Sequence, residues 1–356
     1  MSPLEKIIGS TKILVCVGSG GVGKTTTASA LAYLAAVRGK KVLVLTIDPS
    51  RRLRSTMGLL EQDEIVRINR PDITGELWAS VIDNKKTFDE FVLRASKYSE
   101  AAKKILSNPL YVQLSTTLSG SQEFTALEKL YSSSESNNYD LIVLDTPPTK
   151  HAIDFLEAPQ KLSAIFHDSV AKWFRDPEGK SQNFFMRILA AGTGQVLKAL
   201  EMMTGSEFMR QLSDFFTSIQ QWQGRLEARI ADVHRLLVSP ETQFLLVTSL
   251  DVAKMQEAQF FEREIEKGGY HLAGIIMNRA YPYWMATPPS KVSDLEKEMR
   301  SYYLEKEKLA AKVEAYEASR GRFVVKVPEL PESVSDLETV ATMSRIIAKI
   351  NEEHSA

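Results

Sequence analysis

One short stretch of the sequence has the residue types of a phosphate-binding loop. Residues 18–25 read GSGGVGKT and fit the pattern G-x-x-x-x-G-K-[ST]. Glycines let successive backbone N–H groups turn toward phosphate oxygens, where a Cβ would obstruct them. Lys24 is expected to bring charge to the β- and γ-phosphates, and the Thr25 hydroxyl to ligate Mg²⁺. The stretch predicts a nucleoside triphosphate site, with a chance glycine-rich turn as the alternative.

Two aspartates follow apolar runs that have the composition of buried strands. The run KVLVLTID ends at Asp48, and the run YDLIVLD ends at Asp145. Open α/β sheets bind ligands at the carboxyl ends of their strands. Asp145 is therefore expected to hold Mg²⁺ directly or through water. The alternative for each aspartate is a helix N-cap beyond the strand.

Further strands and helices are needed to position these groups. The apolar run KILVCV precedes the loop, and the helix after it is expected to end near Arg38 and Gly39. Two later runs, QFLLVTS and LAGIIMNR, extend a parallel set with helical stretches between them. The predicted fold is α/β, a doubly wound and mostly parallel sheet with an inserted helical subdomain. The expected core covers about 1–84, 138–157 and 241–356, and the insertion covers 158–240.

The composition excludes several classes of protein. The chain has 356 residues, of which 44% are hydrophobic, and 44 Lys and Arg residues balance 45 Asp and Glu residues. Balanced charge gives no reason to expect a nucleic-acid partner. No apolar run approaches the ~20 residues of a membrane span. Cys16, in an apolar run, is expected to be a buried strand residue, and a single cysteine forms no CxxC zinc site. A cytoplasmic protein without zinc or an integral membrane segment is expected.

Three motifs resemble those of the ArsA-type ATPases, which include anion-transporting ATPases and ATPases that target tail-anchored proteins. GGVGKTT, TIDPSRRL and DTPPTKHAIDFLEAP are similar to the deviant Walker A loop, switch I and switch II of that family. The resemblance covers almost the whole chain, including SGSQEFTALEKLY and VPELPESVSDLETV, and it is strongest to the bacterial branch. It implies Mg²⁺-dependent hydrolysis of ATP to ADP and phosphate.

The resemblance also implies a role for individual residues. Asp48 matches the residue that positions the attacking water, and Asp145 matches the switch II aspartate. Asn278 matches the asparagine that recognises adenine. The backbone loop that cradles the other edge of the base matches Val327, Pro328 and Glu329. Together with Gly18, the nucleotide contacts in the loop match Ser19, Gly20, Gly21, Val22, Gly23, Lys24, Thr25 and Thr26.

Asn278 can also be interpreted from its chemistry. Guanine recognition in related proteins uses N-K-x-D, in which the carboxylate accepts hydrogen bonds from the base. Here the string is Asn-Arg-Ala-Tyr, without a carboxylate at its fourth position. An asparagine amide can both donate and accept at the adenine edge, so adenine is favoured over guanine. The alternative is an asparagine that only forms a turn after a strand.

Ser19 departs from the family pattern. The family loop reads K-G-G-x-G-K-T, and its first lysine reaches across a homodimer to the phosphates of the partner. Ser19 occupies that position and cannot do so, which weakens the inference of a closed homodimer without removing it. Arg51 or Arg52, close to Asp48, is the expected substitute within the same chain. The alternative is that both arginines are solvated.

The insertion 158–240 is the expected candidate for binding a client or protein partner. Its later part carries apolar residues at steps of three and four, a stripe on one helix face: Leu212, Phe215, Ile219, Trp222, Leu226, Ile230, Val233 and Leu237. The stripe is either a groove for a hydrophobic client or protein partner, or part of the packed core. Two functions follow: an ATP-driven targeting factor, or a nucleotide-switched regulator of the MinD and ParA kind or an ATPase subunit of an anion transport system.

The arginines close to Asp48 give the first testable prediction. Arg51→Ala or Arg52→Ala should lower the maximal rate more than it raises KM, because a cation of this kind acts on the transition state and contributes ~10³ to 10⁵ in rate. Turnover per molecule should be independent of protein concentration in dilute solution. A rate that climbs with protein concentration and is indifferent to both substitutions would contradict the prediction.

Overall fold

The computed structural model describes most of the chain in two compact units. The described residues are 2–46, 65–96, 100–108, 111–112, 121–146, 157–158, 223–282, 285, 294–330 and 336–353. The first unit comprises Met1–Asp83, Lys129–Leu156 and Arg235–Ala356, and the second comprises Asn84–Glu128 and Glu157–His234.

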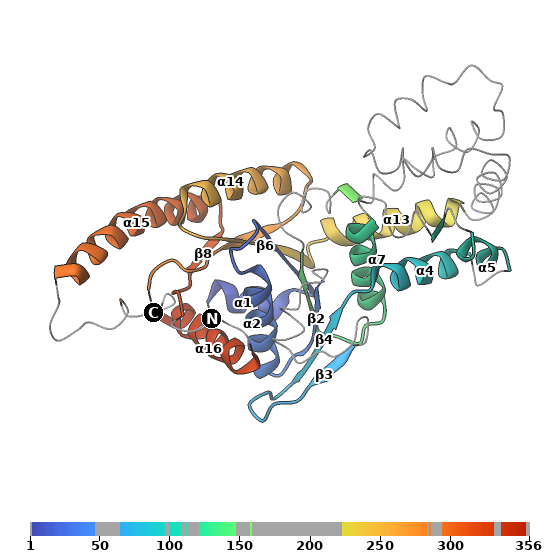
Figure 1. The fold of residues 1–356 in the computed structure, drawn as a ribbon, viewed down its shortest axis with the longest axis horizontal. Helices are drawn as coiled ribbons and strands as arrows, with labels where there is room; N and C mark the ends of the chain where they lie inside the picture. Colours follow the sequence, from blue (N-terminus) through green and yellow to red (C-terminus); the bar gives the residue numbers. More distant parts are fainter. Residues whose placement is uncertain are drawn as a thin grey trace, which may run out of the picture. The chain divides into compact units, whose positions relative to one another are not determined.

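A sheet forms the centre of the first unit (Figure 1). The described strands are β1 (Ile13–Gly18), β2 (Lys41–Thr46), β3 (Val66–Ile68), β4 (Glu76–Val81), β5 (Leu141–Asp145), β6 (Thr242–Thr248), β7 (Leu272–Met277) and β8 (Phe323–Lys326). They form an eight-stranded sheet in the order β3-β4-β2-β5-β1-β6-β7-β8. All neighbours are parallel except the antiparallel pair β3–β4. The predicted doubly wound, mostly parallel fold is confirmed.

The five apolar runs recognised in the sequence correspond to the five central strands. β1, β2, β5, β6 and β7 are buried almost throughout, as expected for parallel strands covered on both faces. β2 and β5 lie on one side of β1, whereas β6 and β7 lie on the other. The direction of winding therefore reverses next to β1, and such a reversal creates a ligand-binding crevice at the carboxyl ends of the strands.

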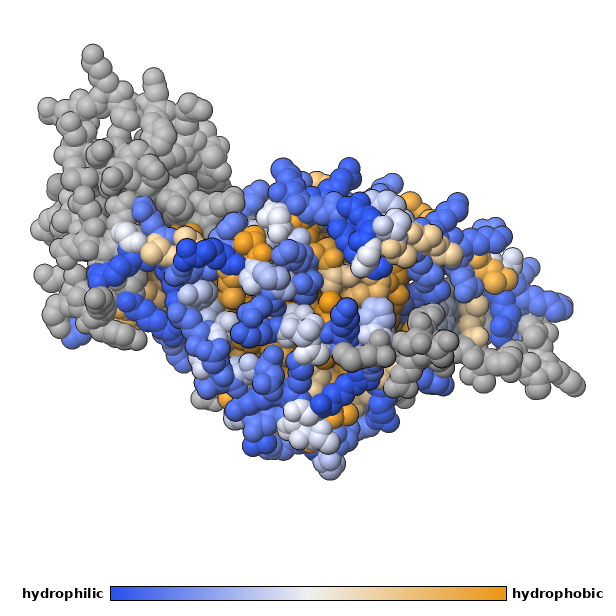
Figure 2. Space-filling model, turned by 180° about the vertical axis from the view of Figure 1, so that it is seen from behind, coloured by the Kyte–Doolittle hydropathy of each residue, from blue (hydrophilic) through white to orange (hydrophobic). Residues whose placement is uncertain are grey.

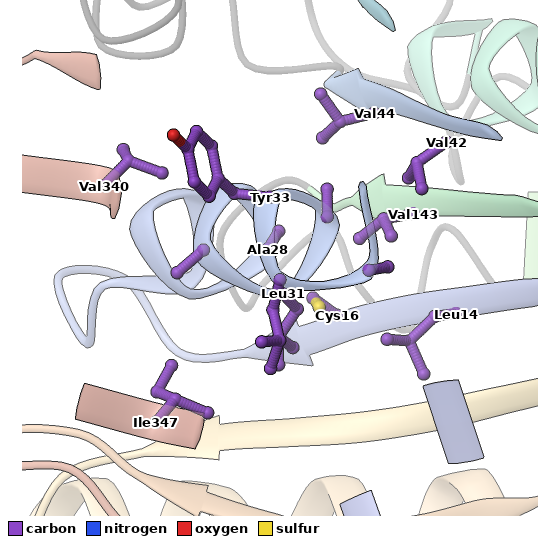
Figure 3. Packing of buried hydrophobic residues seen from close by; sticks show 14 of the residues in the cluster. Leu14, Cys16, Ala28, Leu31, Tyr33, Val42, Val44, Val143, Val340 and Ile347 are labelled. Atoms are coloured by element: carbon purple, nitrogen blue, oxygen red, sulfur yellow. The ribbon is translucent and has the colours of Figure 1, made fainter. Parts of the chain in front are cut away.

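The helix after β1 packs closely on the sheet. This helix, α2 (Lys24–Val37), ends as predicted, with Arg38 as its C-cap and Gly39 at φ 90°. Small side chains allow the close packing: Ala28, Ala30, Ala32, Ala35 and Ala36 are all fully buried. The C-terminal helix α16 (Leu337–Glu353) packs against α2 and β8. Figure 3 shows side chains of this core, which come from β1, β2, β5, α2 and α16.

Other helices complete the two units. α14 (Val252–Lys267) covers β6, β1 and β7 and lies on the side of the sheet opposite to α2 and α16 (Figure 1). α15 (Asp294–Ser319) is one continuous helix of 26 residues beside β8. The remaining described helices are α1 (Pro3–Ser10), α4 (Asn84–Ala95), α5 (Glu100–Leu106), α7 (Ser121–Glu135) and α13 (Gln223–Val238). No helix in the described ranges is long and apolar enough to cross a membrane.

The surface of the described residues is largely hydrophilic on the face shown in Figure 2, with hydrophobic side chains visible between the charged ones.

Part of the predicted apolar stripe can be placed. On α13, the side chains of Ile230, Val233 and Leu237 are buried, so these three members of the stripe are not exposed to solvent. The rest of the stripe up to Trp222 lies outside the described residues.

A polar network ties α2 to the β3–β4 connection and to α16. The Tyr33 hydroxyl donates to the carboxylate of Asp72 at 2.7 Å, and Arg70 Nη1 pairs with Glu338 Oε2 at 2.7 Å. Tyr33 is 1% exposed. Burial, followed by the hydrogen bond to Asp72, raises the pKa of Tyr33 to about 12. The network therefore holds the hydroxyl in its protonated, donating form.

Tyr33→Phe should lower the free energy of unfolding by about 1 kcal/mol, since it removes a hydrogen bond to a charged group that is itself partly hydrated. The wild type should lose this advantage as pH rises from 10 toward 12, because the folded state holds the hydroxyl proton to a higher pH than the unfolded chain does. Urea unfolding at several pH values measures both effects. The matched control is Tyr302→Phe, at a residue 57% exposed, and an equal loss in both variants would contradict the prediction.

Candidate active site

The predicted phosphate-binding loop connects β1 to α2, and two of its glycines have no substitute. Gly18 has φ 149°, and a Cβ on it would lie 2.1 Å from the Val247 carbonyl oxygen of β6. Gly23 has φ 87°, and a Cβ there would lie 2.3 Å from Asn278 Nδ2. Any residue with a Cβ at position 18 or 23 would overlap these neighbouring atoms and strain the backbone. The glycine spacing is therefore dictated by close approach as well as by backbone conformation.

The N-terminus of α2 is suited to bind an anion. Gly23 is its N-cap and supplies no side-chain hydrogen bond, so the first N–H groups of the helix have no capping side chain there. Lys24 is 7% exposed, and its Nζ donates to the Ser19 carbonyl oxygen at 2.9 Å. A buried ammonium group beside a helix N-terminus concentrates positive charge at the loop.

Asp145 lies at the centre of the predicted metal site. Its Oδ2 accepts hydrogen bonds from Thr25 Oγ1 at 2.7 Å and from Thr46 Oγ1 at 2.8 Å. Asp145 and Thr46 are both fully buried. The strand register explains why these side chains lie together. β5 lies between β1 and β2, and Asp145 is opposite Cys16 on β1 and Thr46 on β2. The structure thus brings Thr25 and Asp145 together, although they are 120 positions apart.

Sequence reasoning missed Thr46. It is the last residue of β2, two positions before Asp48, and its hydroxyl points to the same oxygen as that of Thr25. A polar residue at the carboxyl end of a central strand was the available signal.

The atoms around Asp145 suit magnesium. A hydroxyl oxygen and a carboxylate oxygen are the hard ligands that Mg²⁺ prefers, with phosphates and water completing its shell. Within the described ranges, no group of three or more His, Cys, Asp or Glu residues could hold a metal ion. A site that shares its ion with a nucleotide needs no such group.

Ser19 faces into the protein. It is 2% exposed, and its Oγ has no hydrogen-bond partner among the residues that the structure describes. A buried hydroxyl without a partner is unfavourable by about 1–3 kcal/mol, and a phosphate oxygen at the loop would satisfy it. The residue at the position of the family lysine is therefore enclosed within its own loop.

The predicted base-binding residues also lie together. Asn278 is 7% exposed, and its Nδ2 donates to the Val22 carbonyl oxygen at 2.8 Å. The Ala280 N–H donates to the Val327 carbonyl oxygen at 2.9 Å, and the Glu329 N–H donates to Tyr281. Val327 and Pro328 are buried, whereas Glu329 is exposed. The structure therefore places the segment 327–329 beside the turn that follows Asn278.

Two other predicted contributors cannot be placed. Asp48 and the arginine pair Arg51 and Arg52 lie outside the described residues, so their roles stay predictions. The expectation for Cys16 is confirmed, since the thiol is fully buried. Burial, followed by the charge of Asp145, raises the pKa of this thiol. Cys16 is therefore an uncharged core residue, opposite Asp145 in the β1–β5 register.

A glycine loop that opens a helix directly after a central parallel strand, with an aspartate at the end of the neighbouring strand, defines a P-loop nucleoside triphosphatase. The family can be stated more narrowly. The model of the anion-transporting ATPase family matches residues 11–349. The chain belongs to this family and is an ATP-hydrolysing P-loop enzyme.

Individual relatives agree with this assignment. An arsenical pump-driving ATPase of Aquifex aeolicus is 24% identical over 344 residues, covering 94% of this chain and 78% of the relative. The ATPase Get3 of Schizosaccharomyces pombe is 24% identical over 352 residues, covering 97% of this chain and 94% of the relative. An ATPase ASNA1 homologue of Paramecium tetraurelia is 26% identical over 278 residues, covering 76% of each chain. The similarity therefore extends over nearly the full chain.

Proposed function

We propose that this protein is a Mg²⁺-dependent ATPase that couples its nucleotide state to the binding of a hydrophobic client or protein partner through the helical insertion 158–240. The observation that carries the magnesium dependence is the meeting of Thr25, Thr46 and Asp145 at one buried oxygen. The Get3 relative and the arsenical pump-driving relative support the wider class, an ATPase that acts on another molecule.

The described residues support a division of labour around the phosphates. Lys24 would exchange its hydrogen bond with the Ser19 carbonyl for the β- and γ-phosphates, since it lies within reach of its own loop. The buried hydroxyl of Ser19 would donate to a phosphate oxygen. The N–H groups of the loop and of α2 would bind the remaining oxygens. Asn278 and the backbone of 327–329 would contact the adenine base.

Thr25 would ligate the magnesium ion, and Asp145 would hold it directly or through water. A bound magnesium ion neutralises charge on the phosphates. Asp48 is proposed to orient the attacking water, because it follows β2, whose last residue already contacts Asp145. Positioning of this kind is the main contribution that a protein makes to phosphoryl transfer.

The apolar stripe of the insertion is the reason for proposing a hydrophobic client. A protein of this kind would bind its client in the cytoplasm. It would act as a monomer or a homodimer. One observation favours a second function, a nucleotide-switched regulator or transport subunit without a groove: Ile230, Val233 and Leu237 at the end of the stripe are buried. The exposed apolar area of residues 184–240 would separate the two functions.

Two substitutions test the enzymatic part of the proposal. Lys24→Ala should abolish tight binding of Mg·ATP, because it removes the charge from the phosphate loop. Asp48→Asn should retain the affinity for Mg·ATP but lose ~10²- to 10⁴-fold in kcat, since water positioning acts in the transition state. Calorimetric titration and phosphate-release assays measure binding and turnover separately.

Lys12→Ala provides the matched control. Lys12 directly precedes β1, the strand that leads into the phosphate-binding loop. Its side chain is 56% exposed and pairs with Glu241 at 3.3 Å, so the variant should bind and hydrolyse ATP normally. Normal hydrolysis by Lys24→Ala would overturn the assignment of the site. A parallel loss of binding and turnover in Asp48→Asn would place Asp48 on the metal instead of the water.

A further inference from the structure

The backbone around Asn278 is fixed by the neighbouring strands. Asn278 follows β7, and its N–H donates to the Thr248 carbonyl oxygen at the end of β6 at 2.8 Å. Two residues later, Ala280 is bonded to Val327 beyond β8. Asn278 is therefore attached to the sheet on both sides and cannot easily follow movements of the phosphate loop.

The side chain of Asn278 contacts that loop directly. Its Nδ2 donates to the Val22 carbonyl oxygen at 2.8 Å in a buried hydrogen bond that joins residues 256 positions apart. Val22 is 3% exposed. The same nitrogen lies 2.3 Å from the position that a Cβ of Gly23 would occupy. The amide thus lies against the peptide that joins Val22 to Gly23.

This contact sets the orientation of the peptide. The described chain contains no cis peptide bonds, and in a planar trans peptide the C=O and N–H groups point in opposite directions. Because Asn278 holds the Val22 carbonyl on its own side, the Gly23 N–H points to the other side. Gly23 has no Cβ and sits at φ 87°, where rotation of the peptide meets little steric resistance. The hydrogen bond supplies the restraint that the glycine lacks.

We infer that Asn278 is a positioning residue for the phosphate-binding loop, in addition to any contact with the base. It restrains the Val22–Gly23 peptide so that the Gly23 N–H is presented to a phosphate. The hydrogen bond to Val22 uses only one of the two N–H groups on Asn278 Nδ2. The second N–H group and Oδ1 can therefore still form hydrogen bonds with an adenine base. The inference rests on the proposed function, because it assumes a polyphosphate at the loop.

Inorganic tripolyphosphate separates the two roles, because it has phosphates but no base. Asn278→Ala and the similarly sized Asn278→Leu should both bind Mg·tripolyphosphate about three- to tenfold more weakly than the wild type, as expected for the loss of one orienting hydrogen bond. Both variants should lose a larger factor for Mg·ATP. Calorimetric titration gives the affinities, and circular dichroism confirms that each variant is folded.

Asn138→Ala is the control, because Asn138 is an exposed asparagine in the connection between α7 and β5, and its substitution should leave both affinities unchanged. If the Asn278 variants bind tripolyphosphate like the wild type and lose affinity for ATP alone, Asn278 serves only the base and the inference is overturned. The ATPase proposal survives that outcome. If the wild type binds neither compound, the proposed function and the inference fail together.

Discussion

Two hydroxyl groups converge on a single buried carboxylate oxygen, and the geometry of the site depends on this convergence. Thr25 at the start of α2 and Thr46 at the end of β2 both donate to Asp145 Oδ2. A fully buried carboxylate is strongly destabilised unless it is hydrogen-bonded. The hydrogen bonds therefore fix the ends of β5 and β2 and the first turn of α2 relative to one another. Thr25 and Asp145 carry oxygen atoms of the hard kind that Mg²⁺ prefers, which is the basis for proposing a magnesium site here.

The fixed end of the sheet also explains how the phosphate loop is held. Gly18 allows β1 to approach β6 so closely that a Cβ would overlap Val247. At the other end of the loop, the amide of Asn278 holds the Val22 carbonyl. Between them, Lys24 and the enclosed Ser19 bring positive charge and a buried hydroxyl to the loop. Ser19 is uncharged and buried and supplies no cation where the family has a lysine, so Arg51 and Arg52 are the predicted source of that charge.

The sequence predicted what depends on local pattern. The central strands are continuous apolar runs, and the loop and the start of α2 are a short motif, so both could be located before the structure was known. β3 and β8 have only three and four residues, too few for a clear pattern. Thr25 and Asp145 could be assigned to one site because each belongs to a recognised motif, whereas Thr46 and the Val22 contact of Asn278 belong to none and depend on partners 99 and 256 positions away. The fold that brings such residues together is not encoded in local periodicity.

The magnesium dependence of ATP affinity tests the central role of Asp145 most directly. The dissociation constant for ATP should be measured with magnesium and with a chelator, in the wild type and in Asp145→Asn, which retains the size of the side chain but loses its charge. Magnesium should tighten ATP binding to the wild type and have little effect on ATP binding to Asp145→Asn. An equal effect of magnesium on both proteins would show that the ion does not depend on Asp145 and would contradict the account.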